Sequence, residues 1–258
     1  MDWYIYLAII GAGAVAGFIN TLAGSGSLVT LPLLIFLGLP ANVANGTNRV
    51  AILFQNVVGV SSFRQQNMLD VRGGLNLAIP AIVGSLVGAQ IAVNLDETIM
   101  RRTIGVLMVV MLVVILVKPK RWLEGRADVD GGAFGWAQWV IFFFIGIYGG
   151  FIQAGVGVFL LAGLVLSAGY DLVRANAVKV LIVLSFTIFA LAVFVLNGQV
   201  VWFVGLVLAV GNMLGAWIAT RVAVKQGANF VRWLLIAVVA VSGAQLLGLF
   251  DLIGRWLG

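Results

Sequence analysis

The sequence predicts an all-α integral membrane protein with about ten transmembrane segments in two inverted repeats of five segments each. The membrane assignment follows from composition: 62% of the 258 residues are hydrophobic and only 9% are charged, whereas soluble domains carry about 25% charged residues. The repeat assignment follows from an ordered series of motifs in the first half of the chain that recurs in the second half.

The apolar segments are found by breaking the sequence at its charges, its prolines and its Gly-rich stretches. A membrane-spanning helix needs about 20 apolar residues. Ten segments result: 3–20, 22–37, 46–63, 75–95, 99–117, 136–153, 155–168, 177–196, 200–222 and 230–250. The second and seventh are short or broken, so each is either a short span or a re-entrant segment. The N-terminus has no basic region and no cleavage site, which predicts a first membrane helix rather than a signal peptide.

The distribution of Lys and Arg predicts the topology. If all ten segments cross, four of the 15 cations (Arg49, Arg101, Arg102 and Arg255) fall on one side and the other eleven on the opposite side. If the two short segments are re-entrant, the same 15 cations divide eight to seven. Because cytoplasmic loops carry an excess of Lys and Arg, ten crossings are favoured, with both termini outside the cytoplasm. These loop cations also explain the net charge of +6, so no nucleic-acid partner is expected.

Internal similarity divides the chain into residues 1–117, a cytoplasmic linker at 118–134, and residues 135–258. Residues 13–20 recur at 146–153, residues 23–26 at 154–157, and residues 84–89 at 211–216. Five segments per repeat is an odd number, so the second repeat enters the membrane from the opposite side, as in many transporters. The Gly-x-x-x-Gly pairs in these motifs predict close packing of neighbouring helices.

The Gly-rich breaks at 20–27 and 153–157 are the first candidates for function. Irregular backbone at membrane depth is tolerated only where protein buries it or where it lines a wet cavity. Main-chain N–H groups and serine hydroxyls at the following helix start can hold an anion. The alternative is an ordinary loop at the membrane interface.

The second candidates are two cations, Arg49 and Lys179, which are expected in the first turn of the third and eighth segments. A cation inside a membrane needs a partner. No carboxylate lies in the same segments, so a bound anion is the expected partner; the alternative is that both side chains reach the lipid headgroups. The predicted substrate-binding residues are Asn20, Gly24, Ser25, Gly26, Asn45, Thr47, Asn48, Arg49, Gln153, Gly155, Gly157, Asn176 and Lys179.

The residue types that the sequence lacks exclude several kinds of catalytic and metal-binding site. The chain has no cysteine and no histidine, which removes thiolate chemistry, the usual zinc sites and histidine acid–base catalysis. All nine acidic residues fall in loops or at segment ends, and Asp171 is expected to cap a helix. No cofactor, metal site or enzymatic activity is therefore predicted. Two alternatives to a carrier stay open: an anion channel, and a membrane enzyme or scaffold.

Six short motifs stand in a fixed order in the first half: Gly17-Phe18-Ile19-Asn20, Ala23-Gly24-Ser25-Gly26-Ser27, Pro32, Gly38-Leu39-Pro40, Val43-Ala44 and Gly46-Thr47-Asn48. This order resembles the sulfite exporter TauE/SafE family, also called the toluene-sulfonate uptake permease family. The resemblance covers essentially the whole chain, although Ser25 and Ser27 occupy places where the family often has glycine.

The resemblance implies a multi-pass carrier of the bacterial inner membrane. It would export sulfite, sulfoacetate or another sulfur-containing organic anion by alternating access, with a site between the repeats. The expected partners are that small anion and the lipid bilayer. The sequence does not indicate an oligomeric state.

Overall fold

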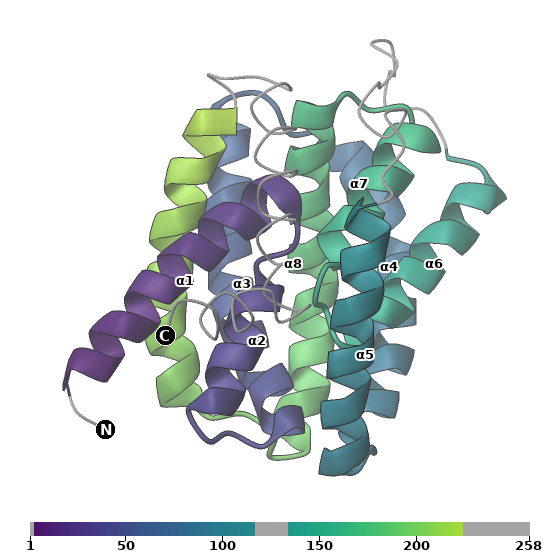
Figure 1. The fold of residues 1–258 in the computed structure, drawn as a ribbon. Coiled ribbons are helices and arrows are strands. Elements are labelled where there is room, and N and C mark those ends of the chain that lie inside the picture. The colour runs from purple at the N-terminus through teal and green to yellow at the C-terminus, as the bar shows by residue number, and fades with distance from the viewer. Residues whose placement is uncertain (1–2, 117–133, 224–258) are drawn as a thin grey trace.

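The computed structural model describes residues 3–116 and 134–223, and in these ranges the chain is helical (Figure 1). Most of the predicted linker at 118–134 and the tenth predicted segment at 230–250 lie outside the described residues. The helices in chain order are α1 (Trp3–Ala23), α2 (Ser27–Phe36), α3 (Ala41–Gln65), α4 (Val71–Val93), α5 (Glu97–Leu116), α6 (Trp136–Phe151), α7 (Val156–Leu166), α8 (Leu172–Leu196) and the Trp202–Ala223 helix.

The helices have the lengths and surfaces of a multi-pass membrane protein. Among the described residues, four helices are long and apolar enough to cross a bilayer: α1, α4, α8 and the Trp202–Ala223 helix. Their outer faces expose large apolar side chains, such as Val83, Val87 and Ile91 of α4. The short second and seventh segments are confirmed, since α2 has 10 residues and α7 has 11. A helix of that length spans about 15 Å, half of the hydrocarbon core.

Two helix hairpins enter the bundle from opposite ends. In the first, α1 and α2 are joined through Gly24 (φ +73°); in the second, α6 and α7 are joined through Gly155 (φ +74°). Glycine adopts these left-handed angles without steric cost, which lets the chain reverse. In Figure 1, α2 lies in the lower half of the bundle and α7 in the upper half. The tips meet, because a Cβ added to Gly24 would overlap the main chain of Gly157.

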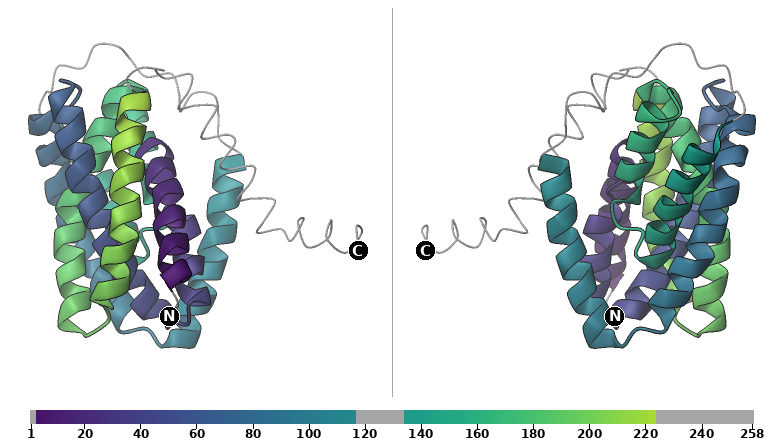
Figure 2. Two further views of the ribbon diagram at one scale, coloured as in Figure 1. Left: turned by 90° about the vertical axis from the view of Figure 1, so that its left-hand side faces the viewer. Right: turned by 90° about the vertical axis from the view of Figure 1, so that its right-hand side faces the viewer.

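The Gly-x-x-x-Gly pairs bring helices into backbone contact, as predicted. Gly84 and Gly88 of α4 face Phe143 and Ile147 of α6, where an added Cβ would overlap main-chain oxygens. The same holds between α1 and the Trp202–Ala223 helix, which lie side by side in the left-hand view of Figure 2. There the contacts are made by Gly13, Gly17, Gly211 and Gly215.

Two helices start five residues earlier than predicted. The third segment begins at Ala41 rather than at residue 46, immediately after Pro40. The eighth begins at Leu172 rather than at residue 177, because the Asp171 carboxylate accepts hydrogen bonds from the first main-chain N–H groups. The predicted Asp171 cap is thus confirmed. Arg49 and Lys179 therefore lie about two turns inside their helices, and the expectation that they lie in the first turn was wrong.

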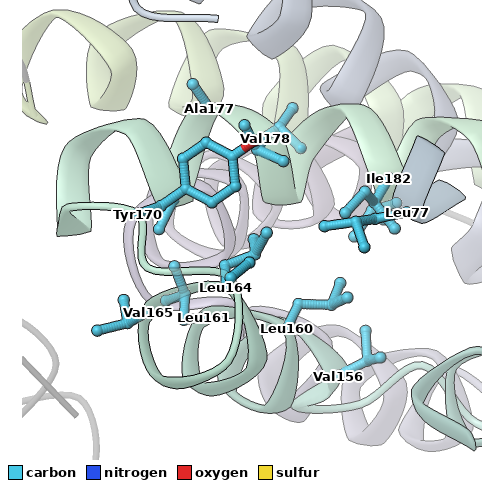
Figure 3. Packing of buried hydrophobic residues seen from close by; sticks show 14 of the residues in the cluster. Leu77, Val156, Leu160, Leu161, Leu164, Val165, Tyr170, Ala177, Val178 and Ile182 are labelled. Atoms are coloured by element: carbon cyan, nitrogen blue, oxygen red, sulfur yellow. The ribbon is translucent and has the colours of Figure 1, made fainter. Parts of the chain in front are cut away.

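An apolar core holds the second hairpin in place. Leu160 and Leu164 of α7 pack with Ile182 of α8 and Leu77 of α4 in one buried cluster (Figure 3). Val156, the first residue of α7, belongs to the same cluster. This packing places the turn between α6 and α7 against the middle of α8.

Loops close the two ends of the bundle with different hydrogen bonds. At one end, the Tyr170 hydroxyl donates to Asp70 (2.6 Å); at the other, the Gln199 side chain donates to the Val93 carbonyl (3.0 Å). Exposed arginines gather near the Tyr170 end: Arg64, Arg72, Arg174 and Arg221. The opposite end mixes both signs, with Asp96, Glu97, Arg101 and Arg102.

Candidate functional site

A small cavity with both polar and apolar lining residues lies at the tips of the two hairpins. Its volume is about 10 Å³, room for about one water molecule. Both hairpins, α3 and α8 contribute to the wall, which consists of Asn20, Gly24, Asn56, Gln153, Val156, Gly157, Lys179 and Val183.

Lys179 is the cation of this cavity. It is only 2% exposed, and its ammonium group donates to the main-chain oxygens of Asn20 (3.2 Å) and Thr21 (2.7 Å). A third hydrogen bond goes to the side-chain oxygen of Asn176, one turn earlier on α8 (2.7 Å). Asn20 and Thr21 belong to the last turn of α1, whose carbonyl groups carry the negative end of the helix dipole. The positive charge of Lys179 therefore lies against the negative, C-terminal end of α1.

Arg49 makes the corresponding contacts with the other hairpin. Its guanidinium group donates to the main-chain oxygens of Gly149 (3.1 Å) and Gly150 (2.5 Å) and to the side-chain oxygen of Gln153 (3.3 Å). The first two lie in the last turn of α6. The guanidinium also lies 4.7 Å from the centre of the Phe194 ring, a favourable cation–π distance.

Neither cation reaches the lipid headgroups. Arg49 is completely buried and Lys179 almost so, which contradicts the alternative that these side chains extend to the membrane surface. The partner expected from the sequence was a bound anion, whereas in the structure both cations bind main-chain carbonyl groups at helix ends. Each cation stands on a helix of one half of the chain and binds the first helix of the hairpin in the other half.

An amide network extends from the cavity into the bundle. Gln55 of α3 accepts hydrogen bonds from the side chains of Asn20 and Asn212, both at 3.2 Å. On the other side, the Gln153 side chain donates to the Thr187 hydroxyl (2.9 Å). Sequence reasoning missed Gln55, Asn56, Thr187 and Asn212. The available signal was their position, since polar residues inside apolar segments tend to be functional.

Five of the predicted site residues line the cavity: Asn20, Gly24, Gln153, Gly157 and Lys179. Several others fasten neighbouring segments instead. Asn48 accepts from the Thr30 hydroxyl and donates to Ser27, which ties α2 to α3. The Thr47 hydroxyl accepts from the main-chain N–H of Val201.

The remaining predicted residues surround the hairpin turns. The Asn45 side chain donates to the Phe151 carbonyl (2.7 Å) at the end of α6. Gly26 packs against α1, and Gly155 forms the second turn. The Ser25 hydroxyl and the Asn176 side-chain nitrogen are buried without a hydrogen-bond partner among the described residues. Buried polar atoms of this kind are usually satisfied by water or a ligand.

Comparison with known proteins agrees with the membrane architecture. The model of the Sulfite exporter TauE/SafE family matches residues 9–246. The chain is 30% identical to Probable membrane transporter protein YfcA of Escherichia coli, over 94% of this chain and 90% of the relative. It is 28% identical to Probable membrane transporter protein ORF9 of a Sinorhizobium species, over 96% and 94% of the two chains.

A third relative, Probable membrane transporter protein of Haemophilus influenzae, is 26% identical over 91% of both chains. No solved structure matches the chain. The family model covers nearly the entire sequence, and the relatives align with it along almost their whole length. The chain therefore belongs to the TauE/SafE sulfite exporter family of membrane transporters.

Proposed function

We propose that this protein is a secondary transporter that exports a small anion, sulfite or a sulfur-containing organic anion such as sulfoacetate, across the bacterial inner membrane. One observation carries the proposal: the buried ammonium group of Lys179 lines a cavity at the meeting point of two broken helix hairpins. Ionisable residues buried inside membrane proteins mark substrate or ion pathways, and many transporters place the substrate site at broken helices near the middle of the bilayer.

The chemistry of the cavity wall suits an oxyanion. Asn20, Asn56 and Gln153 bring amide groups to the wall, and Lys179 brings positive charge. The three N–H donors of Lys179 already serve oxygens of Asn20, Thr21 and Asn176, so we assign this residue attraction of the anion by charge, which is strong in surroundings of low dielectric constant. The amide side chains of the wall would donate the hydrogen bonds to the anion. Arg49, whose contacts fix α6 and Gln153, would act mainly by positioning the second hairpin.

The small size of the cavity supports a mechanism of alternating access. A space of about 10 Å³ holds about one water molecule, and a sulfite ion is larger. The two hairpin tips must therefore separate to admit substrate. We propose that residues 1–117 and 135–258 are inverted repeats and that rocking between them opens the site to each side in turn. The reciprocal contacts of Arg49 and Lys179 support this proposal.

Ligand-dependent stability of the purified protein tests the site. Sulfite, sulfoacetate, sulfate, phosphate and chloride would each be added during thermal unfolding, since a ligand stabilises the folded state by mass action. The best anion should bind the Lys179→Gln variant at least tenfold more weakly, which corresponds to about 1.4 kcal/mol. Arg174→Gln is the matched control, because Arg174 is an exposed cation near the start of the same helix. Equal weakening in both variants would mean that general charge, not this site, attracts the anion.

Flux measurements separate a carrier from the alternative, an anion channel. In liposomes, a carrier should give saturable uptake that is accelerated by substrate on the opposite side. A channel should give a flux that rises linearly with concentration and shows no such exchange. Protein that binds none of the anions and moves none of them would favour the remaining alternative, a membrane enzyme or scaffold.

A further inference from the structure

We infer that Arg49 and Lys179 occupy the positions of coupling cations, so that the transporter neither binds nor requires Na⁺. This inference rests on the proposed transport function and concerns its energy source. In transporters built from broken helices, the carbonyl ends of the half-helices are where Na⁺ is commonly coordinated. Here the carbonyl ends of α1 and α6 are already bound by side-chain cations.

The ammonium group of Lys179 matches a small cation in charge and in the oxygens it contacts. It has three N–H donors, and three oxygens receive them: two main-chain carbonyls of α1 and the side-chain oxygen of Asn176. Backbone and amide oxygens are the ligands that a hard monovalent cation would also use. The side chain thus supplies permanently what a Na⁺ ion would supply reversibly.

Arg49 fills the equivalent place at the other hairpin with a larger group. Its guanidinium contacts two carbonyl oxygens of α6 and the Gln153 side-chain oxygen, and the Phe194 ring covers one face. A mobile cation approaching either helix end would meet a fixed positive charge in surroundings of low dielectric constant, where repulsion is strong.

The unmodified protein provides the first test. Its thermal midpoint should be the same within about 1 °C in NaCl, KCl and choline chloride of equal ionic strength. A Na⁺ site occupied at 100 times its Kd would instead raise the midpoint by about 5 °C or more. Selective stabilisation by Na⁺ would overturn the inference, whether or not any anion is transported.

The Lys179→Ala variant provides the second test, because it leaves three oxygens without their cation. Ammonium or Na⁺ should stabilise this variant selectively, by at least about 3 °C over choline, since a small ion can enter the vacated place. Arg174→Ala, which removes an exposed cation from the same helix, should show no such selectivity. If the thermal midpoints of Lys179→Ala and Arg174→Ala change equally in ammonium, Na⁺ and choline salts, the three oxygens are not a cation site. If Lys179→Ala does not fold, the salt series on the unmodified protein still decides.

Uptake in liposomes then separates this inference from the proposed function. The best anion should enter equally fast when external Na⁺ is replaced by choline. Uptake that stops without Na⁺ would overturn the inference and leave the transport proposal standing. Failure to transport any anion would contradict the transport proposal, while the salt dependence of stability would still decide whether the helix ends bind Na⁺.

Discussion

Lys179 on α8 and Thr21 at the end of α1 are 158 residues apart in sequence, yet the ammonium group of the first donates to the main-chain oxygen of the second over 2.7 Å. Arg49 on α3 reaches the main-chain oxygen of Gly149 on α6 in the same way, across 100 residues. These contacts hold each hairpin to a long helix of the other half of the chain. The site is therefore assembled by tertiary contacts between the halves, so a substitution can act on anion binding or on assembly of the fold.

Asn56 should contribute to binding and little to stability. It lines the cavity, and among the described residues its side-chain nitrogen donates to the Ile52 carbonyl on its own helix alone. Asn56→Ala should weaken anion affinity by up to about tenfold, or 1.4 kcal/mol, with an almost unchanged thermal midpoint. Asn48→Ala is the control: it removes the bonds that tie α2 to α3 and should lower the midpoint more than the affinity. If Asn48→Ala instead weakened anion affinity and Asn56→Ala mainly lowered the thermal midpoint, Asn48 rather than Asn56 would be the binding residue.

Arg49 should matter first for stability. Its planar group serves three oxygens at once, and an ammonium group cannot reproduce that fork. Arg49→Lys should therefore lower the thermal midpoint by several degrees, because each buried acceptor left unpaired costs about 1–3 kcal/mol. Arg101→Lys, in an exposed ion pair with Glu97, should leave the midpoint unchanged. An Arg49→Lys protein that is as stable as the parent but has lost anion affinity would make Arg49 a direct ligand.

The helix contacts at glycine should not tolerate a side chain. An added Cβ at Gly88 would overlap the Ile147 carbonyl, so Gly88→Leu should push α4 away from α6, where overpacking typically costs about 1–3 kcal/mol or more. Gly11→Leu is the control, because no atom of a neighbouring helix in the described part of the chain lies within 4 Å of the Cβ position there. The measurement is the thermal midpoint in detergent. Equal midpoints for the two variants would contradict the close packing of α4 on α6.

The cysteine-free sequence makes the topology directly testable. Arginines dominate the end of the bundle near Gln65, so the positive-inside rule places that end in the cytoplasm. A cysteine at the exposed position Thr98, at the opposite end, should react with an impermeant maleimide in intact cells, and a cysteine at Gln65 only after permeabilisation. Labelling of both from the same side would contradict the bundle orientation, and reversed labelling would contradict the charge argument.

Sequence alone predicted the parts of the fold that local pattern determines. The short segments were recognisable from their length, and the packing of Gly84 and Gly88 from their spacing of four residues. The start of α3 was missed because residues 41–48 are polar enough to resemble a loop, and burial against other helices makes them helical. The partners of Arg49 could not be predicted from sequence. They are main-chain carbonyl groups, which every residue has, and they belong to residues about 100 positions away in the chain.

The hairpin tips offer the most selective test of the proposed site, because two glycines isolate their contact. Gly24 and Gly38 both have positive φ angles, +73° and +91°, so replacing either with alanine should cost about 1–2 kcal/mol of backbone strain. At Gly24 the new Cβ would also overlap Gly157, whereas at Gly38 no described residue beyond its chain neighbours lies within 4 Å of it. Gly24→Ala should therefore lower the thermal midpoint further than Gly38→Ala.

Gly157→Ala completes this comparison, because Gly157 lies within helix α7 and its replacement adds the overlap with Gly24 without left-handed strain. Both tip variants should also change anion affinity, since the contact between the tips closes the cavity, whereas Gly38→Ala should not. If closure limits access, the tip variants will bind and release anion faster than the parent. Gly24→Ala and Gly38→Ala proteins with equal midpoints and equal affinities would show that the tips do not touch in the membrane, and the cavity around Lys179 would then be open rather than closed.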